Sequence, residues 1–311
     1  MRGRVKPRRA QRGFGKMRGS AHHGSMDWVS PERWAALAEE GTDAHRVATG
    51  RDGYLDRYAD WILWSGGKPP RAETLREEMA QRYGFASRGY LARALVKRAT
   101  DQRPAELLAG EEPGEITVRE SGLRYLVEPA GGYSSGLFLD QSLNRRWVER
   151  LGAKRMLNLF AYTCSFTVCA AASGAETCSV DASKRMLGQG RRNLELNSID
   201  PADGHRFLAD DAVKVVPRLI KRGETFDLVV LDPPTFGRAG GRVFRIEKDL
   251  PALAAGCFEL LAPGGHMLMA ANYAPWTARD LRGLCGEAVG SKGCSFEPGE
   301  CPREITGGAI S

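Results

Sequence analysis

From about residue 137 onward, short apolar runs alternate with longer segments whose apolar residues recur every three or four positions. The runs predict five strands, over residues 155–162, 176–181, 205–211, 226–232 and 265–273. The segments between them predict helices over residues 165–174, 183–197, 212–223 and 247–265. Strands this continuously apolar are typical of a parallel sheet covered on both faces. Right-handed crossovers then give an α/β fold with a doubly wound, mostly parallel, Rossmann-like sheet.

The residues before this region show a mixed pattern, which predicts a small α+β leading subdomain. We expect helices over 30–41 and 70–84, a strand over 54–64, and either a strand or a helix over 90–99. Two alternating runs joined by Ser121-Gly122 predict a β-hairpin over residues 115–128. The chain is thus expected to divide into a disordered basic tail (1–26), the leading subdomain (27–130) and the doubly wound domain (131–311).

The net charge of +7 is concentrated at the amino terminus. Residues 1–18 contain eight basic side chains and no acidic one, and the rest of the chain is close to neutral. Such a tail suits RNA phosphates, which it would bind by releasing counterions. It is equally consistent with a solvated arm, or with residues that precede the native start.

Composition excludes several classes of protein. No apolar run approaches the length of a membrane helix, and no secretory signal is visible, so we expect a cytoplasmic protein without membrane contact. The seven cysteines form no C-x-x-C pair and several lie within apolar runs, which favours buried thiols in a reducing compartment. The five histidines do not assemble a ligand set either, so no metal site is expected.

In a doubly wound sheet, ligands bind beyond the carboxyl ends of the strands, and several of the predicted strands end in acidic residues. Asp181 closes the second strand, where a carboxylate can accept hydrogen bonds from ribose hydroxyls; alternatively it caps the following helix. Asp210 and Asp211 close the third strand. One of them can receive an adenine amino group while the other caps the next helix, and we favour Asp211 for the ligand.

The turn after the first strand, Phe-Ala-Tyr-Thr-Cys-Ser (160–165), contains no glycine. A pyrophosphate needs close backbone approach at a helix start, so the pattern disfavours NAD or FAD. S-adenosyl-L-methionine, a nucleoside with a cationic sulfonium in place of phosphates, fits better. After the fourth strand, Asp232-Pro233-Pro234 forms a stiff end suited to holding a flat base beside a methyl donor, with Phe236 able to stack on that base. The alternative is a proline-terminated strand followed by a core phenylalanine.

Five segments together resemble the class I S-adenosylmethionine-dependent rRNA methyltransferase family: GLFLDQ (136–141), LNLFAYTCSFTV (157–168), VDASKRML (180–187), RRNLELN (191–197) and DPPTF (232–236). The likeness covers roughly residues 54–280 and is greatest to the 23S rRNA guanine-N7 methyltransferase domain. The resemblance implies a methyltransferase domain in the second part of the chain, with S-adenosyl-L-methionine as cofactor and RNA, 23S rRNA in particular, as partner.

The resemblance also implies roles for individual positions. Phe138, Asp140 and Gln141 would form a wall of the cofactor pocket, and Asn158, Phe160 and Tyr162 would line its methionine side. Asp181 would hold the ribose and Asp211 would lie near the adenine, while Asp232, Pro233 and Pro234 would face the target base. Arg145 and Arg146 match a basic pair that would touch RNA phosphate, unless they form a solvated helix face.

Chemistry separates the possible target atoms. Methylation at C5 of cytosine needs a cysteine nucleophile, and neither DPPTF nor the fifth strand end (AANY, 270–273) contains one. Guanine N7 carries its own lone pair and needs no covalent catalyst. An enzyme for an exocyclic amine would place an aromatic residue directly after the prolines, where Thr235 stands instead. The sequence thus favours guanine N7.

Three alternatives remain open at the level of sequence. The first is a 5-methylcytosine rRNA methyltransferase, and the second is a nucleotide-dependent oxidoreductase. The third is a catalytically weak RNA-binding or ribosome-assembly protein. The third is motivated by the basic tail and by residues 301–311, which are rich in turn formers where the family would have a closing strand. Ser142, where relatives carry a basic residue, is a further departure.

Overall fold

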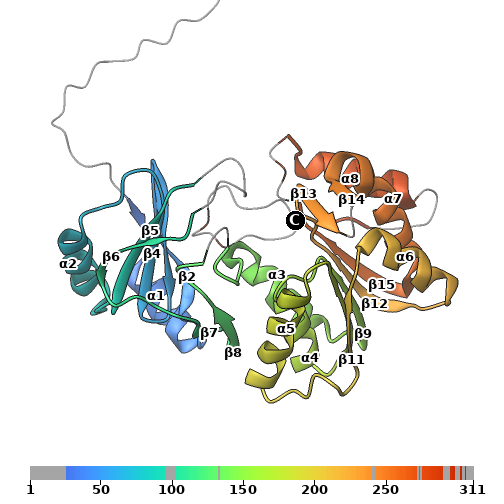
Figure 1. Cartoon of the computed structure of the whole chain (residues 1–311), viewed down its shortest axis with the longest axis horizontal. Helices are drawn as coiled ribbons and strands as arrows, with labels where there is room; N and C mark the ends of the chain where they lie inside the picture. The colour runs from blue at the N-terminus through green and yellow to red at the C-terminus, as the bar shows by residue number, and fades with distance from the viewer. Residues whose placement is uncertain are drawn as a thin grey trace, which may run out of the picture.

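The computed structural model describes residues 26–95, 103–131, 134–239, 242–271, 273, 275–289, 295–297, 302 and 305. Figure 1 shows two α/β parts side by side, the leading part in blue to green and the second part in green to red. The predicted tail (1–26) lies outside the described residues apart from Met26, so its disorder stays a prediction. Of the helices within these ranges, none combines the length and the apolar character needed to cross a membrane.

The leading part is a six-stranded sheet with two helices. Its strands, in spatial order, are β1 (Asp27–Trp28), β2 (Ala44–Gly50), β3 (Gly53–Tyr58), β4 (Trp61–Gly66), β5 (Gly89–Arg93) and β6 (Glu106–Gly110). Helix α1 (Pro31–Glu39) follows β1, and α2 (Ala72–Tyr83) connects β4 to β5, the parallel pair in an otherwise antiparallel sheet. The single strand expected over 54–64 is wrong: a turn at Ala59, with φ of 51°, divides it into β3 and β4.

The predicted hairpin is confirmed as β7 (Ile116–Glu120) and β8 (Leu123–Val127), which pair with each other and not with the six-stranded sheet. The free edge of β8 is bonded instead to side-chain amides of helix α5 (Lys184–Leu196) and its cap. Asn193 Oδ1 accepts the Leu126 N–H at 2.8 Å, and Asn197 Oδ1 accepts the Arg124 N–H at 2.9 Å. Asn193 and Asn197 are four residues apart, about 6 Å along a helix, and Arg124 and Leu126 are two residues apart, about 6.6 Å along a strand. Each amide can therefore lie opposite one backbone N–H of β8.

The second part contains the predicted parallel sheet, in the order β11-β10-β9-β12-β15. The strands are β9 (Arg155–Leu159), β10 (Glu176–Asp181), β11 (His205–Ala209), β12 (Phe226–Leu231) and β15 (Leu261–Met269), and all pair in parallel. Strand order reverses beside β9, which pairs with β10 on one side and β12 on the other. The doubly wound prediction is therefore confirmed, and the switch point lies at the end of β9.

Helices cover both faces of this sheet, as strands without a polar face require. They are α3 (Ser142–Leu151), α4 (Ser165–Ala172), α5, α6 (Ala212–Lys221), α7 (Ile246–Glu259) and α8 (Ala278–Val289). Within β12, Leu228 and Val230 pack in the core with α3, α4 and α5, whereas Val229 and Leu231 pack with α6, α7 and α8. The strand's two-residue period thus divides its side chains between two apolar layers.

A second hairpin, not expected from the sequence, follows Asp232-Pro233-Pro234. It consists of β13 (Phe236–Ala239) and β14 (Arg242–Arg245). Phe244 anchors it, because its buried ring lies 5.1 Å from the ring of Phe160 in the turn after β9. The hairpin is thereby attached beside the switch point.

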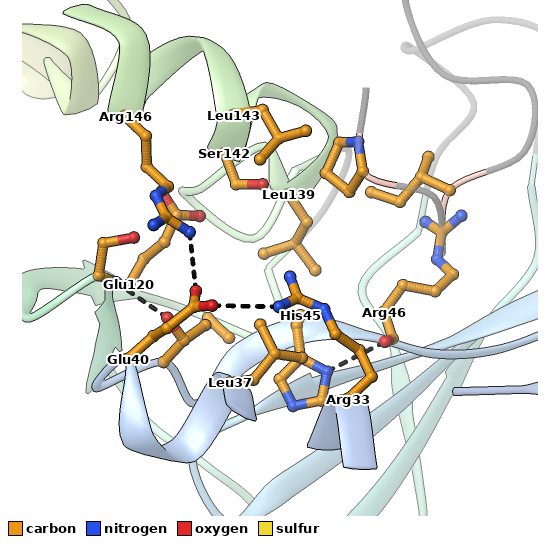
Figure 2. A pocket seen from close by; sticks show the side chains of 15 residues that line it. Arg33, Leu37, Glu40, His45, Arg46, Glu120, Leu139, Ser142, Leu143 and Arg146 are labelled. Carbon is orange, nitrogen blue, oxygen red and sulfur yellow. Dashed lines mark hydrogen bonds and ion pairs between the residues drawn. The ribbon is translucent and has the colours of Figure 1, made fainter. Parts of the chain in front are cut away.

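The two parts meet at a small hollow between α1, β2 and α3 (Figure 2). Glu40 at the end of α1 accepts hydrogen bonds from Arg33, at 3.2 Å, and from Arg146 on α3, at 2.8 Å. Pro302 and Ile305 are buried here and line the same hollow. Most of residues 301–311 lies outside the described residues, but these two positions pack against the junction of the two parts.

Candidate functional site

The turn after β9 has an unusual backbone, because three residues other than glycine have positive φ: Phe160 (57°), Tyr162 (48°) and Cys164 (61°). Side chains disfavour this left-handed region, so surrounding contacts must hold the turn. Asp181, at the end of β10, supplies one such contact: its Oδ2 accepts the Tyr162 N–H at 2.9 Å. Its Oδ1 accepts the Ser183 N–H at 2.8 Å. The carboxylate thus joins the ends of two neighbouring strands.

Asp181 does not cap helix α5, so the capping interpretation of this residue is wrong. The cap is Ser183, whose hydroxyl accepts the Met186 N–H at 3.3 Å. Burial raises the pKa of Asp181, while its two backbone hydrogen bonds act in the opposite direction. Each carboxylate oxygen accepts one backbone bond and has capacity for another, so the group can still receive two hydroxyl donors. The two neighbouring hydroxyls of a ribose are donors of this kind.

Helix α5 presses directly on the strained turn through Gly190. A Cβ at Gly190 would lie 2.4 Å from the Cys164 Sγ and 2.7 Å from its Cβ. Two residues earlier, a Cβ at Gly188 would meet no atom within 4 Å. The close approach places Asn193 beside the turn, where its Nδ2 donates to the Thr163 carbonyl at 2.9 Å.

These two glycines give a matched stability prediction. We expect Gly190→Ala to lower the free energy of unfolding by about 1–3 kcal/mol, because the added methyl group must displace a buried turn. We expect Gly188→Ala to raise it by about 0.5–1 kcal/mol, because alanine is the better helix former where space is open. Urea denaturation of both variants measures the difference. Equal effects would show that α5 does not support the turn.

Asp232, Pro233 and Pro234 follow β12, next to the end of β9. Asp232 is partly buried, Pro233 is buried and Pro234 is exposed. Burial raises the pKa of Asp232 to about 7; repulsion from Asp140 adds to this rise, and attraction to Arg145 opposes it. The strand end therefore presents a carboxyl that changes charge near neutral pH.

The predicted wall residues occupy two kinds of position. Phe138 is 42% exposed, and its ring centroid lies 5.5 Å from that of the partly buried Tyr162, so the two rings form an accessible aromatic surface. Gln141 and Asn158 are buried and act within the protein. Gln141 accepts a bond from Asn144 at 2.7 Å, and Asn158 donates to Thr167 at 2.9 Å. Both side chains are therefore part of the packing around the site and not of its exposed surface.

The assignment of the two acids after β11 needs a correction. Asp211, which we favoured for the ligand, is the N-cap of α6 and accepts the Val213 N–H at 3.0 Å. Asp210 accepts the Asp211 N–H at 2.8 Å and forms an ion pair with Arg218, which lowers the pKa of Asp210. Asp211 is thus the buried, capping residue of the pair, and an adenine contact by either acid stays a prediction.

The expected RNA contact of Arg145 is wrong, and so is its alternative as a solvated helix face. Arg145 is 1% exposed and is bonded to Glu120 through two hydrogen bonds of 2.7 Å. An enclosed guanidinium paired in this way cannot reach a phosphate. Arg146 is partly exposed and bonds to Glu40, so its phosphate contact stays a prediction (Figure 2). The side chain of Phe236 lies outside the described residues, and its stacking role also stays a prediction.

Five cysteines fall within the described part of the chain, and all are free and buried. Burial raises the pKa of Cys164, which lies in the turn after β9, to about 12. The other four have pKa values raised, chiefly by burial, to about 11 or 12: Cys169, Cys178, Cys257 and Cys285. A thiol in this state supplies no thiolate at neutral pH. The same residues contain no cluster of His, Cys, Asp and Glu that could hold a metal ion.

Several supporting residues were missed from the sequence. Thr163 donates from its hydroxyl to the Gly136 carbonyl at 2.7 Å, and Gln189 donates to the Leu126 carbonyl at 2.8 Å. With Asn193 and Asn197, Gln189 completes a row of amides at intervals of four residues along α5. That spacing is visible in the sequence, but it predicts only a shared helix face and not its partner.

Comparison with known proteins bears on this site directly. Residues 67–283 match the model of a family described as S-adenosylmethionine-dependent methyltransferase. A ribosomal RNA large subunit methyltransferase of Deinococcus radiodurans is 34% identical over 266 residues, which are 81% of this chain and 65% of that protein. Ribosomal RNA large subunit methyltransferase I of Aeromonas salmonicida is 31% identical over 258 residues, 78% of this chain and 64% of that protein. The chain thus spans just under two thirds of the length of these relatives.

A solved structure also shares the fold. The crystal structure of SMU.776 in complex with SAH superposes with a TM-score of 0.74 at 26% identity. The match covers 88% of this chain and 72% of SMU.776. The family match includes the turn after β9, Asp181 and Asp232-Pro233-Pro234. The protein therefore belongs to the family of S-adenosylmethionine-dependent methyltransferases.

Proposed function

We propose that the protein transfers a methyl group from S-adenosylmethionine to a base of RNA, in large-subunit rRNA, with guanine N7 as the favoured atom. The observation that carries the proposal is the carboxyl edge of the parallel sheet. There Asp181 holds a glycine-free turn, and Asp232 presents a partly buried carboxyl with a raised pKa beside it. Family membership and the names of the relatives, which are rRNA large subunit methyltransferases, support it.

The residues present fit the cofactor. Asp181 can accept the ribose hydroxyls, and the Phe138 and Tyr162 rings can flank the ligand. Asp140 and Asp232 make this edge acidic, which favours a cationic sulfonium and opposes a pyrophosphate. When bound, S-adenosylmethionine supplies an electrophilic methyl carbon. The protein's task is then to align a nucleophilic base atom with that carbon, because alignment provides much of the rate.

The position of Asp232 suits a base that becomes positively charged. Methylation of guanine at N7 consumes the lone pair and leaves a cationic ring. An ionised Asp232 within a low-dielectric site would stabilise that developing charge. Pro233 and Pro234 fix the backbone that carries it, so little reorganisation is needed when the base arrives. No proton has to be removed before the attack.

C5 methylation of cytosine is the main alternative reaction, and it needs a cysteine thiolate that adds to the base. Among the described residues, the cysteines are buried and have raised pKa values. Cys294 and Cys301 lie outside the described residues. The observations thus favour a nitrogen target. Contacts to RNA phosphate remain proposals for Arg146 and for the basic tail, which would bind by counterion release.

RNA that contains 5-fluorocytidine tests the proposal, because a C5 enzyme becomes covalently trapped on this base. The protein would be incubated with labelled S-adenosylmethionine and a fluorocytidine-substituted transcript of large-subunit rRNA. We expect label in the RNA and no protein–RNA adduct that survives denaturing electrophoresis. A labelled adduct would establish C5 chemistry. Bound cofactor without any transfer to RNA would favour the RNA-binding or assembly alternative.

A further inference from the structure

Arg145 forms the most enclosed charged contact at the junction of the two parts. Its Nε and Nη2 atoms donate to the two carboxylate oxygens of Glu120, on β7, at 2.7 Å each. The same Nη2 donates to the Phe138 carbonyl at 2.8 Å. Tyr125 and Cys169 lie close enough to interact with its charge, and the Phe166 ring centroid lies 6.0 Å from the guanidinium carbon. One side chain on α3 thus joins the β7–β8 hairpin to the start of the GLFLDQ segment.

Stability alone does not account for this arrangement. A buried ion pair costs desolvation energy, and well-packed apolar residues of similar volume often replace such a pair without loss of stability. The Nη1 atom of Arg145 adds to the cost, since it is buried and finds no hydrogen-bond partner among the described residues. What a guanidinium offers, and an apolar side chain does not, is a rigid fork that fixes several acceptors at once.

The acceptors that Arg145 fixes lead directly to the cofactor site. The Phe138 carbonyl also accepts the Gln141 N–H at 3.2 Å, which closes the short 3-10 turn Leu139–Gln141 (η2). The Phe138 ring faces Tyr162, and the Tyr162 N–H is bonded to Asp181. On its other side, the charge of Arg145 is close enough to Asp232 to counteract the rise in its pKa. Arg145 therefore interacts with both sides of the proposed site, the Phe138 segment and Asp232.

We propose that Arg145 is a positioning residue for methyl transfer: through Glu120 and the Phe138 carbonyl it sets the Phe138–Gln141 wall in its ligand-binding geometry before the cofactor arrives. The proposal rests on the proposed function for the identity of the ligand. The claim that Arg145 holds the Phe138–Gln141 wall in place does not depend on the identity of the ligand. Preorganisation of this kind raises affinity because the wall needs no further ordering on binding.

The chain contains a matched control pair. Arg192 on α5 donates to both carboxylate oxygens of Glu115, at 2.7 and 2.5 Å, and so joins the same hairpin to the same domain. That pair is exposed and has no bond to the Phe138 segment. Arg145→Lys and Arg192→Lys each replace a two-pronged contact by a point charge. The double variant Glu120→Gln/Arg145→Met removes both buried charges together, so it avoids an unpaired carboxylate while it eliminates the donor to Phe138.

Two measurements on the full chain test the proposal. Without ligand, we expect amide exchange over residues 138–142 to accelerate at least tenfold in Arg145→Lys and in the double variant, and less than twofold in Arg192→Lys. In calorimetric titration, we expect the first two variants to bind S-adenosylhomocysteine about tenfold more weakly, and Arg192→Lys to bind within twofold of the unmodified protein. In turnover, we expect Arg145→Lys, which keeps a positive charge at this position, to raise KM for S-adenosylmethionine while kcat changes less than threefold.

The outcomes separate the two proposals. Unchanged exchange over 138–142 in the Arg145 variants would overturn the positioning role, as would equal losses in the Arg145 and Arg192 variants. If the unmodified protein does not bind S-adenosylhomocysteine, the proposed function fails. The exchange measurement then still decides whether Arg145 holds the wall.

Discussion

Replacement of Asp181 by alanine is expected to weaken S-adenosylhomocysteine binding by about 100-fold. Asp181 accepts the Tyr162 and Ser183 N–H groups and is placed to accept ribose hydroxyls. Hydrogen bonds to a charged group contribute roughly 1.5–3 kcal/mol each, so the loss of the ribose contact and of the turn's support amounts to about 3 kcal/mol. Isothermal titration calorimetry measures the change.

Asp227 is the matched control for this substitution. It lies near the start of β12, at the edge of the sheet opposite to Asp181. It also accepts two backbone N–H groups, from Lys154 at 3.0 Å and Arg155 at 2.9 Å. Asp227→Ala should therefore lower the melting temperature by a comparable amount and leave binding within twofold. Equal loss of affinity in the two variants would mean that Asp181 matters for folding and not for the ligand.

Replacement of Asp232 by asparagine is expected to lower the rate of methyl transfer by about 100- to 1,000-fold, with little change in S-adenosylhomocysteine affinity. The reason is the loss of a negative charge placed where positive charge develops, a contribution of roughly this size in other enzymes. In the unmodified protein the single-turnover rate should rise with pH through about 7, the pKa of Asp232. A rate that stays flat across pH 6–8 would contradict the role.

The same substitution has the opposite effect on stability. The folded protein raises the pKa of Asp232 from 3.8 to about 7, so between these values it retains a proton that the unfolded chain releases. The free energy of unfolding therefore falls as pH rises from about 4 to about 7, by up to about 4 kcal/mol. Asparagine cannot ionise, so it avoids the free-energy cost of a charged Asp232 in the folded protein. Asp232→Asn should therefore be more stable than the unmodified protein at pH 8 and similar to it at pH 4. Thermal unfolding at both pH values tests the sign.

The sequence predicted the parts of the fold that follow from simple periodicity. Continuous apolar runs indicated the parallel strands, and their acidic ends indicated Asp181 and Asp232, because strand ends meet at one edge of such a sheet. The 115–128 hairpin was predictable from its alternation and from Ser121-Gly122. All of these signals are local in the chain.

The errors arose where distant segments decide the outcome. Arg145 and Arg146 are adjacent and chemically alike, yet one is enclosed by Glu120 and the other is partly exposed beside Glu40. Nothing in their immediate sequence distinguishes them. Asp211 caps α6, a role expected for Asp210, for a similar reason, since the N-cap depends on the residue at which α6 begins. The β13–β14 hairpin depends on Phe244 finding Phe160, which local pattern does not reveal.

The most direct test of the account is nucleoside mass spectrometry of unmodified large-subunit rRNA after incubation with the protein and S-adenosylmethionine, with the unmodified protein and Asp232→Asn compared side by side. The account predicts a 7-methylguanosine signal that grows with the unmodified protein and is at least 100-fold slower with the variant. A 5-methylcytidine signal, or a rate that the substitution leaves unchanged, would contradict it.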